Sequence, residues 1–232
     1  MGSKNRHAKE ILEIVLKNRK DGQFYVEPFV GGFNLIDKVS GNRIANDKQF
    51  YLIELFKAVQ NGWIPPDNIS EEEYKIARLN KSLSEPFLTG FIGFGCSFSG
   101  KWFGGYARGN QTNGNPRNYC LESKKNIMKQ AEKIKGISIF NVDYWELQIP
   151  ENSIIYCDPP YENTQKYSNE FDHKKFWAWC EKMVNLGHSV FVSEYNAPEN
   201  WKCVWSKKVN NTLDLNTGSK QGIEKLFTLK NE

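Results

Sequence analysis

Apolar residues follow two spacings along the chain, and each spacing predicts a different kind of element. Near the amino terminus they recur every three or four residues, as on one buried face of a helix: Ala8, Ile11, Leu12, Val15 and Leu16. Residues 153–157 form instead a short unbroken apolar run, which is typical of a parallel strand buried on both faces. Because strands and helices predicted in this way alternate, the sequence predicts an α/β fold with a parallel sheet.

The same patterns predict the remaining elements. Strands are expected at residues 24–29, 43–46, 137–142, 153–158, 189–193, 202–205 and 225–229. Helices are expected at residues 33–39, 47–59, 118–135 and 174–185. Another helix begins at Ser70, where Ser-Glu-Glu-Glu forms a capping box. Residues 85–116 are rich in Gly and aromatic residues without a helical period, so loops and a hairpin are expected there. We expect one domain of residues 1–59 and 118–232, with 60–117 inserted.

The composition excludes several classes of protein. No run of about eighteen apolar residues and no charged-then-apolar leader is present, so we expect a soluble cytoplasmic protein without a membrane partner. The cysteines are widely spaced and never form C-x-x-C: Cys96, Cys120, Cys157, Cys180 and Cys203. This spacing favours reduced thiols and argues against both a disulfide framework and a zinc site. We therefore expect no metal.

Charge is unevenly distributed, although the net charge is only +4. Residues 96–136 hold eight Lys or Arg against two Glu, a net charge of +6, whereas residues 140–200 have a net charge of −6. Aromatic residues are interleaved with the basic ones: Trp102, Phe103, Tyr106 and Tyr119. Such a mixture suits phosphate contact and stacking on bases. Residues 124–135 fit a solvated helix face, whereas for residues 101–119 we prefer the nucleic-acid interpretation.

The candidate chemistry lies directly after the apolar run 153–157. There the chain reads Asp158-Pro159-Pro160-Tyr161, and prolines cannot continue a strand, so it leaves the sheet at Asp158. Ligands of open α/β sheets bind beyond the carboxyl ends of strands. A carboxylate and a backbone carbonyl held rigidly beside an aromatic ring suit the amino group of a flat heterocycle. The motif therefore predicts a site for a nucleobase amine.

Three motifs together resemble one enzyme family. Asp158-Pro159-Pro160-Tyr161 resembles the catalytic motif of nucleobase amino-methyltransferases. Residues 25–34 (Y-V-E-P-F-V-G-G-F-N) resemble their cofactor motif, and residues 1–6 (M-G-S-K-N-R) resemble the G-x-K element that precedes it. In this order they are similar to the D12-class, alpha-group N6-adenine DNA methyltransferases, most of all to phage-encoded ones. The resemblance implies a Rossmann-like S-adenosylmethionine-dependent methyltransferase sheet with an inserted target-recognition region.

The resemblance also implies a cofactor site. Its residues are Lys4, Glu27, Pro28, Phe29, Gly31, Gly32, Asp47, Asp143, Tyr144 and Asp158. Gly31 and Gly32 permit the close backbone approach that the amino-acid moiety of S-adenosylmethionine needs, although an ordinary turn would also explain them. Lys4 offers a charge to the methionine carboxylate.

Two acids of the cofactor site follow predicted strands. Asp47 comes about twenty residues after Glu27, the spacing at which an acid reaches ribose hydroxyls, and it also suits a helix N-cap. The resemblance implies that Asp143 accepts from the adenine amine of the cofactor and that Tyr144 lies beside the ring. A turn would equally explain Asp143.

The mechanism implied by the resemblance acts on double-stranded DNA, and the lone, compact chain suggests a monomer. An adenine is flipped into the pocket and stacks on Tyr161, while Asp158 and the carbonyl of Pro159, in the turn fixed by Pro160, accept the two N6 hydrogens. Expected DNA contacts are Lys101, Trp102, Tyr106, Arg108 and Arg117. Either arginine suits a guanine edge or a phosphate, and the recognition sequence stays unassigned. Residues 193–196 are expected to line the pocket and residues 163–169 to close over substrate.

Three alternatives stay open. N4-cytosine methyltransferases share the amine chemistry, but their motif more often has Ser at the position of Asp158. RNA or protein amine methyltransferases are a second possibility, against which the insertion and Lys4 argue. The third is an inactive DNA-binding protein that keeps the fold. C5-cytosine chemistry is disfavoured because the chain has no Pro-Cys pair. The sequence does not show whether such an enzyme protects phage DNA, marks host DNA or accompanies a restriction nuclease.

Overall fold

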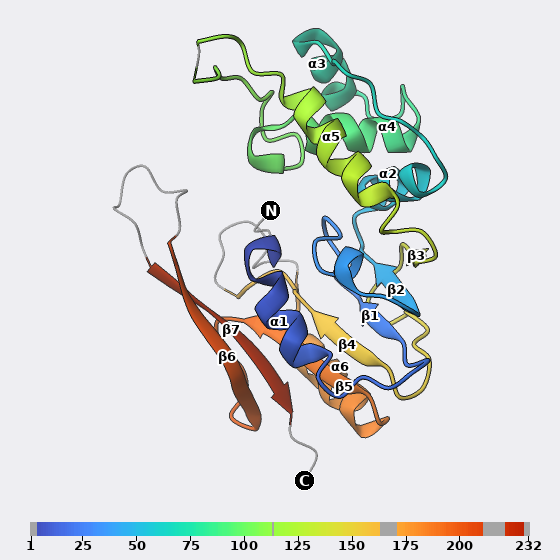
Figure 1. Ribbon diagram of the computed structural model, residues 1–232, viewed down its shortest axis with the longest axis vertical. Coiled ribbons are helices and arrows are strands. Elements are labelled where there is room, and N and C mark those ends of the chain that lie inside the picture. Colours follow the sequence, from blue (N-terminus) through green and yellow to red (C-terminus); the bar gives the residue numbers. More distant parts are fainter. Residues whose placement is uncertain (1–3, 113, 163–170, 211–220, 230–232) are drawn as a thin grey trace.

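The computed structural model describes residues 4–112, 114–162, 171–210 and 221–229. In this part of the chain seven strands form one sheet in the order β3-β2-β1-β4-β5-β7-β6 (Figure 1). Their bounds are β1 Tyr25–Glu27, β2 Arg43–Asn46, β3 Ser138–Phe140, β4 Ile154–Cys157, β5 Ser189–Glu194, β6 Trp201–Asn210 and β7 Gln221–Leu229. The first five are parallel, which confirms the predicted α/β class, whereas β7 runs antiparallel to both β5 and β6.

Both faces of the sheet are covered, because successive side chains of a strand point to opposite faces. In β4, Ile154 and Tyr156 join the cluster that contains α1 (Ala8–Val15), whereas Ile155 and Cys157 join the cluster that contains α6 (His173–Asn185). All four side chains are at most 3% exposed. The catalytic motif predicted at the end of β4 therefore begins on a strand fixed from both sides.

A helical lobe lies beyond the carboxyl edge of β1 and β2, at the top of Figure 1. It consists of α2 (Phe50–Gln60), α3 (Glu71–Leu79), α4 (Pro86–Gly90), a π-helical turn (Phe91–Gly95) and α5 (Tyr119–Ala131). The expected capping box is present, because Ser70 Oγ accepts from Glu73 N at 3.1 Å and Glu73 Oε2 accepts from Ser70 N at 2.7 Å. The lobe thus combines the predicted insertion with a helix on either side of it.

The expectation that residues 85–116 lack helix is wrong for its first part, since α4 and the π-helical turn occupy residues 86–95. Phe91 and Ile92 are at most 4% exposed, and Gly90 packs directly on the backbone of α2. A helix buried on all sides has no amphipathic period, so the pattern could not reveal it. Antiparallel bridges follow, Ser97 with Tyr106 and Asn110 with Pro116, where a hairpin was expected.

Two predicted helices are shorter in the structure. Residues 33–39 form only a 3-10 turn at Ile36–Lys38, because Phe33 adopts a positive φ of 59° that no regular right-handed helix allows. The helix expected at 47–59 begins at Phe50. Two further 3-10 turns lie at Lys4–His7 and Phe98–Gly100.

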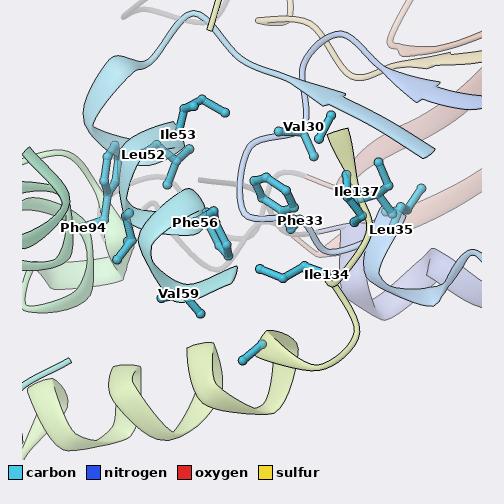
Figure 2. Close-up of a cluster of buried hydrophobic side chains, with 14 of the residues drawn as sticks. Val30, Phe33, Leu35, Leu52, Ile53, Phe56, Val59, Phe94, Ile134 and Ile137 are labelled. Carbon is cyan, nitrogen blue, oxygen red and sulfur yellow. The ribbon is translucent and has the colours of Figure 1, made fainter. Parts of the chain in front are cut away.

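The lobe shares a hydrophobic core with the sheet (Figure 2). Phe33, from the turn after β1, stacks on Phe56 of α2 with ring centroids 4.1 Å apart. Ile134, which follows α5, belongs to the same cluster and is fully buried. Continuous packing of this kind fixes the lobe against the carboxyl edge of the sheet.

Candidate active site

Four carboxylates and one ammonium group meet at the carboxyl edge of the sheet. Glu27 ends β1, Glu194 ends β5 and Asp158 follows β4, so three parallel strands deliver their acids to the same edge. The antiparallel β7 delivers Glu224 to that edge from its amino end. Lys4, from the 3-10 turn before α1, lies among them.

Lys4 is the centre of this network. Its Nζ lies 3.3 Å from Asp158 Oδ1 and 3.5 Å from Glu224 Oε2, and it donates a hydrogen bond to the hydroxyl of Tyr161. The side chain is only 8% exposed. Burial lowers the pKa of Lys4, but Asp158 and Glu224 more than offset this, and the net pKa is raised. Lys4 therefore carries a full positive charge beside the catalytic motif.

Asp158 faces opposing influences. Burial raises the pKa of this carboxyl above its ordinary value, while the charge of Lys4 and hydrogen bonds from Lys4 and Tyr161 act to lower it. Its side chain is 23% exposed, so it can still be reached from outside. The ring of Tyr161 packs edge-on against Tyr195, with centroids 4.7 Å apart. The sequence motif thus appears in space as a carboxylate beside a fixed aromatic ring.

Glu194 holds the chain that follows Tyr161. Its Oε2 accepts from Glu162 N at 3.2 Å and its Oε1 accepts from Tyr195 N at 2.7 Å. The residue is 2% exposed, and burial raises its pKa to about 7. Sequence reasoning named only the segment 193–196. An acid at the end of an otherwise apolar strand was the signal that could have selected Glu194.

Glu27 is a buried acid within the predicted cofactor motif. It is 3% exposed, and its Oε1 accepts from Tyr25 Oη at 2.8 Å. Burial raises the pKa of Glu27 to about 8, against the opposing effect of that hydrogen bond, and the nearby Asp158 adds to the rise. Glu27 is therefore largely protonated near neutral pH, which limits the negative charge at this edge.

The Gly31-Gly32 turn and Asp47 lie together, as expected. Gly31 N donates to Asp47 Oδ2 at 2.9 Å, and Gln49 N donates to Asp47 Oδ1 at 2.9 Å, just before α2 begins. Gly31 has a φ of 50°, and a Cβ there would meet nothing within 4 Å. The backbone of this turn thus borders open space next to a carboxylate.

Asn46 is a structural residue of the site that sequence reasoning missed. Its Nδ2 donates to the carbonyls of Pro28 and Val142, both at 3.0 Å, and its Oδ1 accepts from Val142 N at 3.0 Å. The residue is 1% exposed. By these bonds it joins the segments that follow β1 and β3 to the end of β2. A polar residue ending an apolar strand was again the available signal.

Asp143 and Tyr144 have different surroundings. Asp143 Oδ1 pairs with Lys48 Nζ at 2.9 Å near the surface. Tyr144 is 5% exposed, and its ring lies 5.2 Å from Phe29 and 5.1 Å from Trp179. The structure therefore brings the predicted cofactor residues Phe29 and Tyr144 together inside an aromatic cluster.

The predicted DNA contacts lie in the lobe, away from Lys4. Lys101 is exposed, whereas Trp102 stacks on Tyr51 at 5.1 Å and Tyr106 Oη donates to a backbone carbonyl at 2.7 Å. Each arginine is held by an acid: Arg108 with Glu71 at 2.5 Å, and Arg117 with both oxygens of Glu122 at 2.6 and 2.7 Å. Tyr106 and Arg117 line one shallow pocket.

Some predictions concern residues outside the described ranges. The first residues of the G-x-K element (1–3) and the expected closing loop (163–169) are among them. Within the described ranges, no group of three or more His, Cys, Asp or Glu side chains is arranged to hold a metal ion. None of the helices in the same ranges is long and apolar enough to cross a bilayer.

The structure has the mixed α/β, seven-stranded sheet expected of a Rossmann-like methyltransferase, and the predicted catalytic motif follows β4. The model of the D12 class N6 adenine-specific DNA methyltransferase family matches residues 1–89 and 103–207. The chain belongs to this family and is a DNA adenine methyltransferase. Residues 90–102 and 208–232 are not matched, and the first of these two segments lies inside the lobe.

Solved structures with a similar arrangement share little sequence with this chain. One is yhhF of Escherichia coli, a proposed methyltransferase, at 10% identity and a TM-score of 0.36, with 97% of this chain and 88% of that one covered. SMU.472, a proposed methyltransferase complexed with SAH, shows 11% identity and a TM-score of 0.38, with coverages of 98% and 52%. aTrm5 in complex with tRNALeu shows 12% identity and a TM-score of 0.37, with coverages of 96% and 45%. The assignment therefore rests on the family match and the site.

Proposed function

We propose that the protein transfers a methyl group from S-adenosylmethionine to N6 of an adenine turned out of duplex DNA, at a specific site and as a monomer. The observation that carries this proposal is the position of Asp158 and Tyr161. They lie at the carboxyl edge of the sheet, anchored by Lys4, beyond the end of a strand adjacent to the one that leads into the Gly31 turn.

The residues of the Gly31 turn suit S-adenosylmethionine, which supplies a methyl group on a positively charged sulfur. Open space beside Gly31 lets the backbone approach the amino-acid moiety. Each oxygen of Asp47 accepts one N–H bond and keeps lone-pair capacity for a ribose hydroxyl. Asp143 would accept from the adenine amine, with Phe29 and Tyr144 behind it. We assign Lys4 as the partner of the methionine carboxylate. Its ammonium group would bind this carboxylate in addition to its ion pairs with Asp158 and Glu224.

The catalytic motif suits an exocyclic amine. The Asp158 carboxylate and the carbonyl of Pro159 would accept the two N6 hydrogens, which withdraws the nitrogen lone pair from the ring. The lone pair would then bond to the methyl carbon as the bond from that carbon to sulfur breaks, which leaves S-adenosylhomocysteine, and the extra N6 proton would pass to the Asp158 carboxylate. Tyr161 provides a flat surface for the base, and Pro160 limits the freedom of the turn. Most of the rate enhancement comes from orientation, which can supply on the order of 7–11 kcal/mol. An amine inside a duplex is out of reach, so the base must leave the stack.

The lobe is the proposed DNA-reading surface. Lys101, Arg108 and Arg117 would contact phosphates or a guanine edge, and each arginine would then exchange Glu71 or Glu122 for DNA. Trp102 and Tyr106 support this surface from below through their packing. Figure 1 shows the lobe above the sheet that contains β4, and Asp158 follows the end of β4, so DNA bound to the lobe can present a base to the site.

The proposal is tested by incubating the purified protein with S-adenosylmethionine and bacterial DNA from a strain without adenine methylases. The product is read by nucleoside mass spectrometry. We expect N6-methyladenine from the native protein and none from Asp158→Ala. If the product is N4-methylcytosine, the enzyme methylates an amine but its target base is cytosine and not adenine. The absence of any methylated base would refute the proposal.

A further inference from the structure

Glu224 is a partly buried acid of the site to which the methyl-transfer chemistry assigns no role. It precedes Lys225, which pairs with Glu194 at the carboxyl end of β5. Because β7 is antiparallel, the residue before Lys225 lies just past that end and reaches the same edge as Asp158. Its side chain is 21% exposed, and its Oε2 is 3.5 Å from Lys4 Nζ.

The Oε2 atom of Glu224 is enclosed without a hydrogen bond. It is almost inaccessible to solvent, and no donor among the described residues satisfies it. Placing a carboxylate oxygen in this way is unfavourable unless a charge compensates it. Lys4 is the cation that lies within ion-pair distance. The position of Glu224 is therefore explained by Lys4.

Lys4, in turn, depends on its partners for its position. It belongs to a four-residue 3-10 turn at one end of the chain and carries its charge on a flexible stem. Asp158, Tyr161 and Glu224 contact the ammonium group, which also lies 4.7 Å from the centre of the Tyr161 ring. Of these contacts, only Glu224 comes from outside the catalytic motif.

We propose that Glu224 is a positioning residue that holds the Lys4 ammonium against Asp158 and Tyr161. The proposal rests on the methyl-transfer function given above. When the oxygens of Asp158 accept the hydrogens of the adenine amine, their hold on Lys4 weakens. Glu224 then keeps a counter-charge beside the buried ammonium, so Lys4 stays in place and Tyr161 stays oriented. Without Glu224, binding of the base would compete directly with the Lys4–Asp158 pair.

A double-mutant cycle tests this role. The variants are Glu224→Gln, which keeps the shape but removes the charge, Lys4→Met and the combination of both. We expect Glu224→Gln to lower the single-turnover rate at least about tenfold when S-adenosylmethionine is saturating, so that any weaker cofactor binding through Lys4 does not contribute to the loss. In the Lys4→Met background, Glu224→Gln should cause no further loss, because the residue it positions is gone.

Matched controls separate positioning from stability. Glu10→Gln removes another ion pair between the amino-terminal helix and the final hairpin, with Lys207, away from the site. We expect it to leave the rate unchanged. Glu224→Asp, which keeps the charge but withdraws it by one methylene, should give an intermediate rate and replaces Glu224→Gln if that variant does not fold.

Three results would overturn the inference. The first is a native rate in Glu224→Gln, and the second is an additive loss in the double variant, which would mean that Glu224 acts independently of Lys4. The third is a loss of rate in both Glu224→Gln and Glu10→Gln that is in the same proportion to the loss of Tm in each variant. If the native protein itself methylates no DNA, the proposed function fails together with the inference. If the native protein is active, only the inference is at stake.

Discussion

At the scale of single residues, burial largely decides which carboxyls of the site are charged. Glu27 and Glu194 lie deep at the ends of β1 and β5, and their pKa values rise to about 8 and about 7. Asp158 is the one of the three that lies beside Lys4, whose charge favours its ionised form. The edge thus holds its charged pair next to two acids that can be neutral near physiological pH.

Replacement of Glu27 should reveal its protonation. Because its pKa is raised from 4.5 to about 8 in the folded protein, the folded state binds more protons than the unfolded state between these values. Stability from this residue is present at low pH and is lost as the pH rises toward 8, by on the order of a few kcal/mol. Glu27→Gln should remove this dependence. Urea unfolding at several pH values measures it, and parallel curves for both proteins would contradict the expectation.

The position of the predicted catalytic motif was readable from sequence because a carboxylate and two prolines end an apolar strand. The partners of its residues were not. Lys4 was expected at the cofactor, whereas in the structure it pairs with Asp158, Tyr161 and Glu224. Glu224 reaches the site only because β7 runs antiparallel to β5. The sequence pattern of a strand does not reveal the direction in which the strand runs in the sheet. Long-range pairing of this kind is decided by the assembled sheet.

At the scale of elements, Asn46 determines how the loops of the site are joined. Its three hydrogen bonds connect the segments after β1 and β3. Asn46→Ala would leave buried backbone groups without partners and should lower the free energy of unfolding by on the order of 2–3 kcal/mol. Asn42→Ala is the matched control, because it removes one exposed bond to Gly22 and should cost less. Equal losses in chemical denaturation would contradict this role.

The contact between α4 and α2 depends on Gly90. A Cβ at this position would lie 2.1 Å from the carbonyl oxygen of Tyr51, which is backbone and cannot turn away. Gly90→Ala should therefore destabilise the protein by on the order of 1–3 kcal/mol. Gly95→Ala, whose Cβ would meet side-chain atoms no closer than 3.1 Å, should cost less. Thermal unfolding of the two variants compares them, and equal Tm values would contradict the prediction.

Sequence predicted the parallel strands well and residues 86–95 of the lobe poorly, for a physical reason. A strand covered on both faces, such as β4, is uniformly apolar over a few residues and ends at a turn, so its pattern is local. Residues 86–95 are also apolar apart from Thr89, but their helical form depends on contacts with α2 and α5. The same local pattern thus fits two structures, and tertiary packing selects between them.

At the scale of the whole molecule, charge is divided between the two parts that we propose to contact DNA. The basic residues of 96–136 belong to the lobe, and the acidic stretch 140–200 contains the catalytic edge. This division favours binding of the phosphate backbone at the lobe and disfavours it at the edge, which has to accept a base rather than a phosphate.

Removal of the lobe arginines should therefore weaken DNA binding without changing the chemistry. For Arg108→Ala and Arg117→Ala we expect weaker binding and a salt dependence reduced by roughly one unit of slope each, with the single-turnover rate on saturating DNA preserved. Lys9→Ala on α1, a 90% exposed side chain outside the lobe, is the control. Fluorescence anisotropy across a range of salt concentrations measures the strength of DNA binding and its salt dependence. An effect of Lys9→Ala equal to that of the arginine variants would contradict the assignment.

The central claim is that the Asp158 carboxylate accepts the adenine amine at this edge. The most direct test is the single-turnover rate of methyl transfer by Asp158→Asn, which keeps the size of the side chain and removes its charge. We predict a rate at least about a hundredfold below that of the native protein, with a much smaller change in the affinity for S-adenosylmethionine. A native rate in this variant would contradict the account.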